Sequence, residues 1–116
     1  MTHSLEPGTK VAAADVALEH APVSPEQVVD GAPTVGEVVL GEVAGVEIGV
    51  WECTPGVSTD IEVDEVSMVI SGRARIDFVA PPLPSIELGP GDVFRLEAGM
   101  KTVWTVMETL RKVYVA

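Results

Sequence analysis

Valine constrains the fold of this chain most strongly, because it occurs 21 times among the 116 residues. Its branched β-carbon restricts χ1 and fits a pleated sheet better than a helix. Eleven glycines and nine prolines interrupt the valine-rich runs at short intervals. After residue 30, no apolar stripe with helical spacing is long enough to support an α/β fold. Short strands separated by turns are typical of a sandwich or barrel, so the predicted fold class is all-β.

Length and composition predict one packed domain, with 47% hydrophobic and 22% charged residues. No apolar run approaches the ~20 residues that span a bilayer. The N-terminus carries acids and has no unbroken apolar core, so we expect no signal peptide and a soluble, cytoplasmic protein. The single cysteine, Cys53, excludes an internal disulfide. The two histidines, His3 and His20, both lie near the N-terminus and are not predicted to be ligands.

The charge of the chain is strongly acidic, with a formal net charge of -11. Twelve acids separate Lys10 from Arg73, the next basic residue. Such a chain repels phosphate backbones and anionic lipid, so neither nucleic acid nor a membrane is an expected partner. The acids form either a solvated outer face or a binding site for cations or amines.

The chain is predicted to divide into an N-terminal arm with one short helix (residues 1–34) and a barrel (residues 35–116). Ser24 followed by Pro25 is typical of a helix start, and Gly31 and Pro33 end that helix. The arm is suited to wrap over a sheet edge of this chain or of a partner. The predicted strands are Val38–Leu40, Val46–Cys53, Asp64–Ile70, Arg73–Val79, Ser85–Leu88, Val93–Leu96, Thr102–Met107 and Lys112–Val115.

The strand Asp64–Ile70 is the most informative, because successive side chains of a strand point to opposite faces. One face carries Val66 and Met68, and the other carries Glu65 and Ser67. Neither face is plainly polar, so we expect cover on both. The Glu65 face would line a barrel lumen, and the apolar face would meet a second sheet or a partner subunit.

Several motifs resemble the cupin superfamily, and more narrowly the small cupins related to ureidoglycine aminohydrolase. The resemblance implies a double-stranded β-helix, also called a jelly-roll barrel, that pairs into a homodimer. The matching residues are Trp51–Gly56, Asp64 and Glu65 with Gly72, Gly89–Asp92, Ala98 and Gly99, Trp104, and Arg111–Tyr114.

The metal motif of that family is incomplete in this chain. Glu65 occupies the position of the glutamate ligand. The two leading histidine positions fall on Thr59 and Ile61, or on Ser58 and Asp60 with the longer spacing, and the last falls on Thr102. We therefore predict no metal site and no cofactor, because cupin metals rely on imidazole ligands. The alternative is a divalent metal held by Glu65 with help from Asp60 or Cys53.

Each candidate site residue has a structural alternative. The predicted catalytic residues are Glu65, Lys112 and Tyr114, with Glu65 as acid or base. Alternatively, Glu65 is a former metal ligand that now bonds to Ser67 or Thr102. Lys112 would then belong to an ion pair at the rim, and Tyr114 would be a half-buried tyrosine. The predicted ligand-binding residues are Trp51, Cys53, Glu65, Ser67, Thr102 and Trp104. Alternatively, the two tryptophans simply fill the lumen, and Cys53 is a buried structural residue. The regularly spaced acids Glu37, Glu42, Glu47 and Glu52 are interpreted as solvated strand ends and turns.

Three functions remain open: binding of a small molecule in the lumen, an enzyme of hydrolase or isomerase type that uses Glu65, and a structural protein with an inert lumen. A cavity that Glu65 reaches would argue against the inert barrel. A second titratable group within hydrogen-bond reach of Glu65 would favour the enzyme over simple binding.

Overall fold

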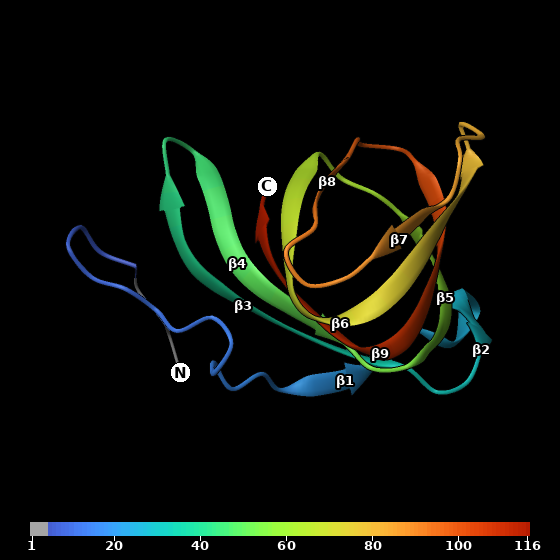
Figure 1. The fold of residues 1–116 in the computed structure, drawn as a ribbon, viewed down its shortest axis with the longest axis horizontal. Helices are drawn as coiled ribbons and strands as arrows, with labels where there is room; N and C mark the ends of the chain where they lie inside the picture. Colours follow the sequence, from blue (N-terminus) through green and yellow to red (C-terminus); the bar gives the residue numbers. More distant parts are fainter. Residues whose placement is uncertain (1–4) are drawn as a thin grey trace.

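The computed structural model describes residues 5–116 as an antiparallel β-sheet curled into a half-barrel (Figure 1), so the predicted all-β class is confirmed. His3 lies outside the described residues. The predicted short helix is a single 3-10 turn, η1 (Pro25–Gln27), and the Ser24 side chain makes no capping hydrogen bond. The strands are β1 (His20–Pro22), β2 (Val28–Asp30), β3 (Thr34–Val43), β4 (Val46–Cys53), β5 (Gly56–Ile61), β6 (Glu65–Ala80), β7 (Ile86–Leu88), β8 (Val93–Leu96) and β9 (Lys101–Val115).

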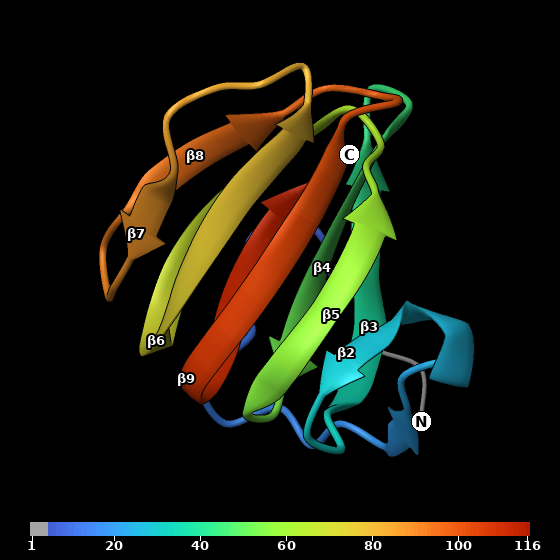
Figure 2. The same cartoon turned by 90° about the vertical axis from the view of Figure 1, so that its right-hand side faces the viewer.

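Two long strands, β6 and β9, run through both layers of the half-barrel. The segment 110–115 of β9 pairs with β4 and with the beginning of β6. The segment 101–106 of β9 pairs with β5 and with the end of β6. Figure 2 shows β6, β9, β5 and β2 side by side in this order. Each long strand had been predicted as two short ones, and β5 had not been predicted as a strand.

The bend in β6 is centred on Gly72, where the sequence predicted that a strand ends. The register of the pairing between β6 and β9 shifts between Ser71 and Arg73, the two residues that flank Gly72. Gly72 has a φ of +91°, a left-handed conformation that side chains disfavour. A β-carbon at this position would overlap the backbone of Thr109 and Leu110 on β9. The missing side chain therefore lets one continuous strand turn the corner between the two layers.

The hydrophobic core lies on the concave side of the sheet. Val69 points into it from the first half of β6, and Ile76 does so from the second half, after the register shift. Trp104 of β9 is buried there as well, at 5% exposure. The other buried members of the core are Cys53, Ala74, Leu88, Phe94, Leu96, Val106 and Leu110.

Among residues 5–116, no segment covers the convex face at the beginning of β6. Val66 and Met68, which were expected to meet a second layer or a partner, are each 43% exposed. The register of the sheet places Val93 of β8 beside Met68 and Val115 of β9 beside Val66. We call these four residues the convex apolar face.

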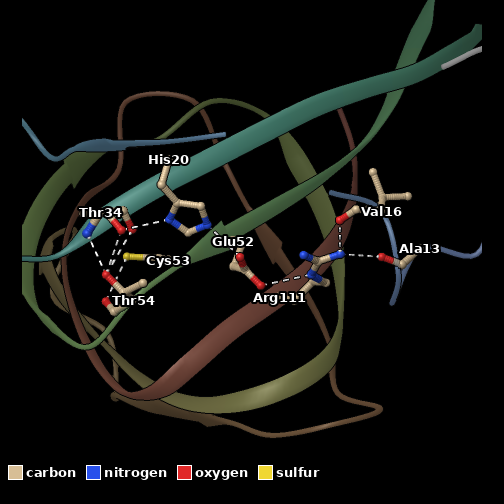
Figure 3. Close-up of polar contacts among 8 residues, drawn as sticks. All are labelled: Ala13, Val16, His20, Thr34, Glu52, Cys53, Thr54 and Arg111. Atoms are coloured by element: carbon tan, nitrogen blue, oxygen red, sulfur yellow. Dashed lines mark hydrogen bonds and ion pairs between the residues drawn. The ribbon is translucent and has the colours of Figure 1, made fainter. Parts of the chain in front are cut away.

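The N-terminal arm packs on its own chain. Its short strand β1 pairs with β3, and β2 pairs with β5, although the arm was predicted to have little structure of its own. The Arg111 guanidinium on β9 donates hydrogen bonds to the carbonyl oxygens of Ala13 and Val16, at 2.9 and 2.8 Å (Figure 3). These bonds hold the arm against the convex side of the sheet.

Glu52 links this arm contact to β1. One carboxylate oxygen accepts a hydrogen bond from Arg111 Nε at 3.1 Å, and the other lies 2.7 Å from Nε2 of His20 (Figure 3). Glu47 and Glu52 lie near the two ends of β4, as expected, but the expectation that they are simply solvated is wrong. Both lie within β4 and both bond to other side chains.

The described residues 5–116 include no helix long and apolar enough to cross a membrane.

Candidate functional site

A cavity of about 430 Å³ lies on the concave side of the sheet. The residues 22–27 around η1 form one lip. Its walls carry the indole rings of Trp51 and Trp104 and the charged side chains of Glu65 and Lys112. The cavity is open to solvent on one side and combines polar and aromatic groups, as ligand sites commonly do.

Lys112 and Glu65 form a buried ion pair in this wall, with 2.7 Å between Nζ and Oε2. Only 5% of the lysine side chain and 12% of the glutamate side chain are exposed. Three aromatic rings surround the ammonium, with centroids 4.7 Å away for Trp51, 5.1 Å for Trp104 and 5.5 Å for Phe94. Glu65 thus bonds to Lys112, rather than to Ser67 or Thr102, and both cation–π contacts and the carboxylate stabilise the charged lysine.

Glu62 is a second buried carboxyl group, and sequence reasoning missed it. It follows β5 directly and is 8% exposed. Its Oε2 accepts hydrogen bonds from Thr102 Oγ1 at 2.5 Å and Trp104 Nε1 at 2.9 Å. Alternation of side chains beyond Asp60 could have found it, since Glu62 shares the inward face of Asp60.

Burial raises the pKa of Glu62 above its usual value, and the nearby Asp60 carboxylate acts in the same direction. The pKa of Asp60 is raised as well, chiefly because the cavity walls remove water from it, although the side chain is still exposed at the mouth. The site therefore contains two kinds of carboxyl group. Glu65 is compensated by a lysine, whereas Glu62 and Asp60 hold protons more tightly than free carboxyl groups do.

Replacing Glu62 by glutamine is expected to flatten the pH dependence of stability. A raised pKa in the folded state means that the folded protein binds a proton more tightly than the unfolded chain, so stability is lost as pH rises from 4.5 through the raised value. Glutamine imitates the neutral acid and removes that loss. Urea unfolding at a series of pH values measures the effect, with the exposed Glu87→Gln as the matched control. Parallel curves for Glu62→Gln and the wild type would contradict this expectation.

Cys53 belongs to the hydrophobic core and also lines the cavity. It is 3% exposed, and its Sγ lies 3.4 Å from the carbonyl oxygen of Thr54. Burial raises the pKa of the thiol to about 11, which leaves almost no thiolate at neutral pH.

Tyr114 faces the cavity but bonds away from Glu65. Its hydroxyl donates to Glu47 Oε2 at 2.8 Å, and its ring lies against Gly49, where a β-carbon would overlap it. Burial and the carboxylates of Glu37 and Glu47 raise the pKa of this hydroxyl. The structure thus separates Tyr114 from the pair of Glu65 and Lys112, with which it had been grouped as an acid/base set.

Ser67 and Thr102 occupy different surroundings. Ser67 is 2% exposed and lies outside the cavity lining, and its Oγ has no hydrogen-bond partner within residues 5–116. Thr102 is buried, and its hydroxyl group donates a hydrogen bond to Glu62.

The register of β5 decides between the two spacings considered for the metal motif. Ser58 lies opposite Trp104 and Asp60 lies opposite Thr102. Because Trp104 and Thr102 are buried on the concave side, Ser58 and Asp60 are the inward pair. Thr59 and Ile61 alternate to the other face.

These residues do not fit a divalent metal ion. The motif positions supply two neutral hydroxyls and two carboxylates, and the hydroxyl of Thr102 is already bonded to Glu62. The Lys112 ammonium lies 2.7 Å from Glu65, so a metal bound there would meet a like charge. Within residues 5–116, no three or more His, Cys, Asp or Glu side chains lie close enough to hold one ion.

Solved structures confirm the predicted fold. A protein of unknown function from Pseudomonas syringae pv. tomato is 24% identical, with a TM-score of 0.73 over 87% of this chain and 44% of that one. The chain thus spans less than half of that protein. The EutQ protein of Clostridium difficile is 19% identical, with a TM-score of 0.62 over 94% of this chain and 80% of that one. A structure described as one of DMSP lyases is 18% identical, with a TM-score of 0.59 over 70% and 46%.

Sequence comparison narrows the assignment. No curated protein matches the chain. The family of EutQ-like cupin domains matches residues 40–114, which include all of β6, all but the last residue of β9 and most of the cavity wall. The predicted cupin superfamily is confirmed by this match, whereas the narrower relation to ureidoglycine aminohydrolase is not. With more than half of its length matched, the chain belongs to the family of EutQ-like cupin domains.

Proposed function

We propose that this protein binds a small polar molecule in the cavity of its half-barrel. The observation that carries the proposal is the cavity of about 430 Å³, into which Glu65 and Lys112 both project. Such a space is within the range of small-molecule sites, and its charged groups lie against aromatic walls. An inert barrel would fill this volume with side chains instead.

The charges of the wall restrict the ligand. Asp60 and Glu62 lie on the β5 side of the cavity, and their oxygens accept hydrogen bonds. A ligand that carries N–H groups, such as an amine or amide, satisfies these acceptors better than an acid does. The acidic cavity therefore favours a neutral or cationic nitrogenous ligand.

Native mass spectrometry of gently purified protein tests this proposal, with elemental analysis of the same sample. We expect a small organic mass that disappears on denaturation. Ser58→Phe, which directs a large ring into the cavity, should lack that mass while keeping the fold. If exposure to pools of small amides and amines leaves the wild-type mass unchanged, the binding proposal is wrong.

The second candidate is an enzyme that transfers protons with Glu65. The observation that favours it is the ammonium of Lys112 within 2.7 Å of that carboxylate. Together they form a titratable couple at the cavity wall, which is the geometry that acid–base catalysis needs. Following the resemblance to ureidoglycine aminohydrolase-type cupins, the reaction would be hydrolysis or isomerisation of a small nitrogenous or carbonyl compound. The cytoplasmic location of the protein remains a prediction.

We further propose that a second copy of this chain covers the convex apolar face. The four side chains of this face come from three neighbouring strands, and a contiguous exposed apolar patch of this kind commonly marks an interface. The four residues themselves are uncharged, and the charged neighbour that the register places beside Val66 is a cation, Arg95 of β8. Two acidic chains can therefore meet there without placing carboxylates opposite each other.

Replacing Met68 by lysine is expected to convert such a dimer into a monomer, because two copies of the new charge would be buried at the interface. Sedimentation velocity measures the result. Met107→Lys is the matched control, because Met107 is also an exposed methionine but lies outside the convex apolar face. A wild-type protein that sediments as a monomer would refute the dimer.

A further inference from the structure

The ammonium of Lys112 has more donors than partners. A lysine ammonium carries three N–H groups. Among residues 5–116, the structure provides one acceptor for them, Oε2 of Glu65. The residue is 4% exposed, so its ammonium opens only to the cavity that it lines. Buried donors of this kind need an acceptor, because leaving a charged group unsatisfied is costly.

The surroundings of Lys112 leave one direction for such an acceptor. The rings of Trp51, Phe94 and Trp104 enclose the ammonium, and their faces stabilise its charge without offering an oxygen. Both Lys112 and Glu65 line the cavity. A ligand oxygen that enters the cavity can therefore reach the unpaired N–H groups.

We propose that the Lys112 ammonium is the resident cation of this site and binds the acceptor oxygen of a neutral carbonyl or amide ligand. This inference rests on the proposed function, since it names the group that holds the ligand in the cavity. The proposal also agrees with the finding that the residues at the motif positions do not fit a metal ion. Glu65 occupies the glutamate position of the cupin motif, where a metal would supply the positive charge, and here Lys112 supplies it.

The charge of Glu65 determines which oxygen is preferred. Because this carboxylate already compensates the ammonium, a ligand carboxylate would gain little attraction and would be repelled by Glu65. A neutral amide oxygen avoids that repulsion and still accepts an ion-assisted hydrogen bond. Its N–H groups can meanwhile donate toward Asp60 and Glu62 on the β5 side of the same cavity.

Titration of three small probes tests the inference: acetamide, acetate and guanidinium. Trp51 and Trp104, the two tryptophans of the chain, both line the cavity, so their fluorescence and indole N–H signals report binding there. In the wild type we expect acetamide to bind more tightly than either charged probe. Lys112→Met should weaken acetamide roughly tenfold or more, as expected for loss of a charged hydrogen bond. Lys10→Met, the same change in the exposed arm, should have no effect.

Glu65→Gln provides an opposite expectation. It keeps the ammonium but removes the competing carboxylate, so acetate should become the preferred probe. If Lys112→Met unfolds, the double variant Glu65→Gln/Lys112→Met removes both charges together, and it should bind neither acetamide nor acetate measurably.

The possible failures are distinguishable. Equal binding of acetamide to the wild type and to Lys112→Met, or to Glu65→Gln and the double variant, overturns the role of Lys112 but leaves the binding cavity in place. If the wild type binds guanidinium more tightly than acetamide, the proposed role of Lys112 is also wrong, because the site would then recognise cations. If none of the three probes perturbs either tryptophan of the wild type, this inference and the proposed function both fall.

Discussion

Replacing Gly72 by alanine is expected to destabilise the fold by about 2–4 kcal/mol. The residue has a φ of +91°, and holding alanine there costs roughly 1 kcal/mol. The new β-carbon would also overlap the backbone of Thr109 and Leu110, which cannot rotate away as a side chain could. Forced backbone movement of this kind costs about 1–3 kcal/mol. Urea unfolding followed by tryptophan fluorescence measures the loss.

Gly91→Ala separates the two causes. Gly91 has nearly the same φ, +90°, but a β-carbon there would meet nothing within 4 Å. This control should therefore lose only the conformational part, roughly 1 kcal/mol. Equal losses for the two variants would mean that β6 and β9 separate freely at the corner, contrary to a tightly packed bend.

Replacing Lys112 by methionine is expected to cost about 3 kcal/mol, because it leaves Glu65 as a buried charge without its partner. The pair is well shielded, with 5% and 12% of the two side chains exposed. Methionine is similar in length and apolar, so the aromatic contacts of Trp51 and Trp104 are largely kept. The loss is therefore mainly electrostatic, and chemical denaturation measures it.

The double variant Glu65→Gln/Lys112→Met should recover most of this stability. Neither member is then charged, and neutral replacements of buried pairs are often tolerated. A double-mutant cycle with Glu65→Gln gives the coupling between the two side chains. Additive losses would show that the two charges do not stabilise each other, and the ion pair would then have no structural role.

Local patterns predicted the strand content well because they depend on nearest neighbours in sequence. Alternation of side chains in Asp64–Ile70 placed Glu65 and Ser67 on the inner face and Val66 and Met68 on the outer one, as the structure has them. The same reasoning failed at Gly72. A glycine is typical of a turn, and only the packing of β6 against β9 shows that the strand continues through it.

The candidate site depended more on long-range packing. Sequence reasoning grouped Glu65 with Lys112 as a possible acid/base set, but the two residues are 47 positions apart, and their ion pair follows from the path of two long strands. Glu62 was missed because β5 had not been predicted as a strand, so the alternation of its inward side chains was not considered. Tyr114 was grouped with Glu65, although the hydroxyl reaches Glu47 on β4 instead.

The sequence by itself determined the all-β class, most strand positions and the loss of the histidines on which a cupin metal depends. These properties follow from residue type, local alternation and motif spacing, none of which needs a partner distant in the chain. Only the tertiary structure decided which carboxyl group is compensated by a cation and which one is buried without one. Burial and charge pairing arise where strands meet, so they belong to the folded sheet rather than to any single segment.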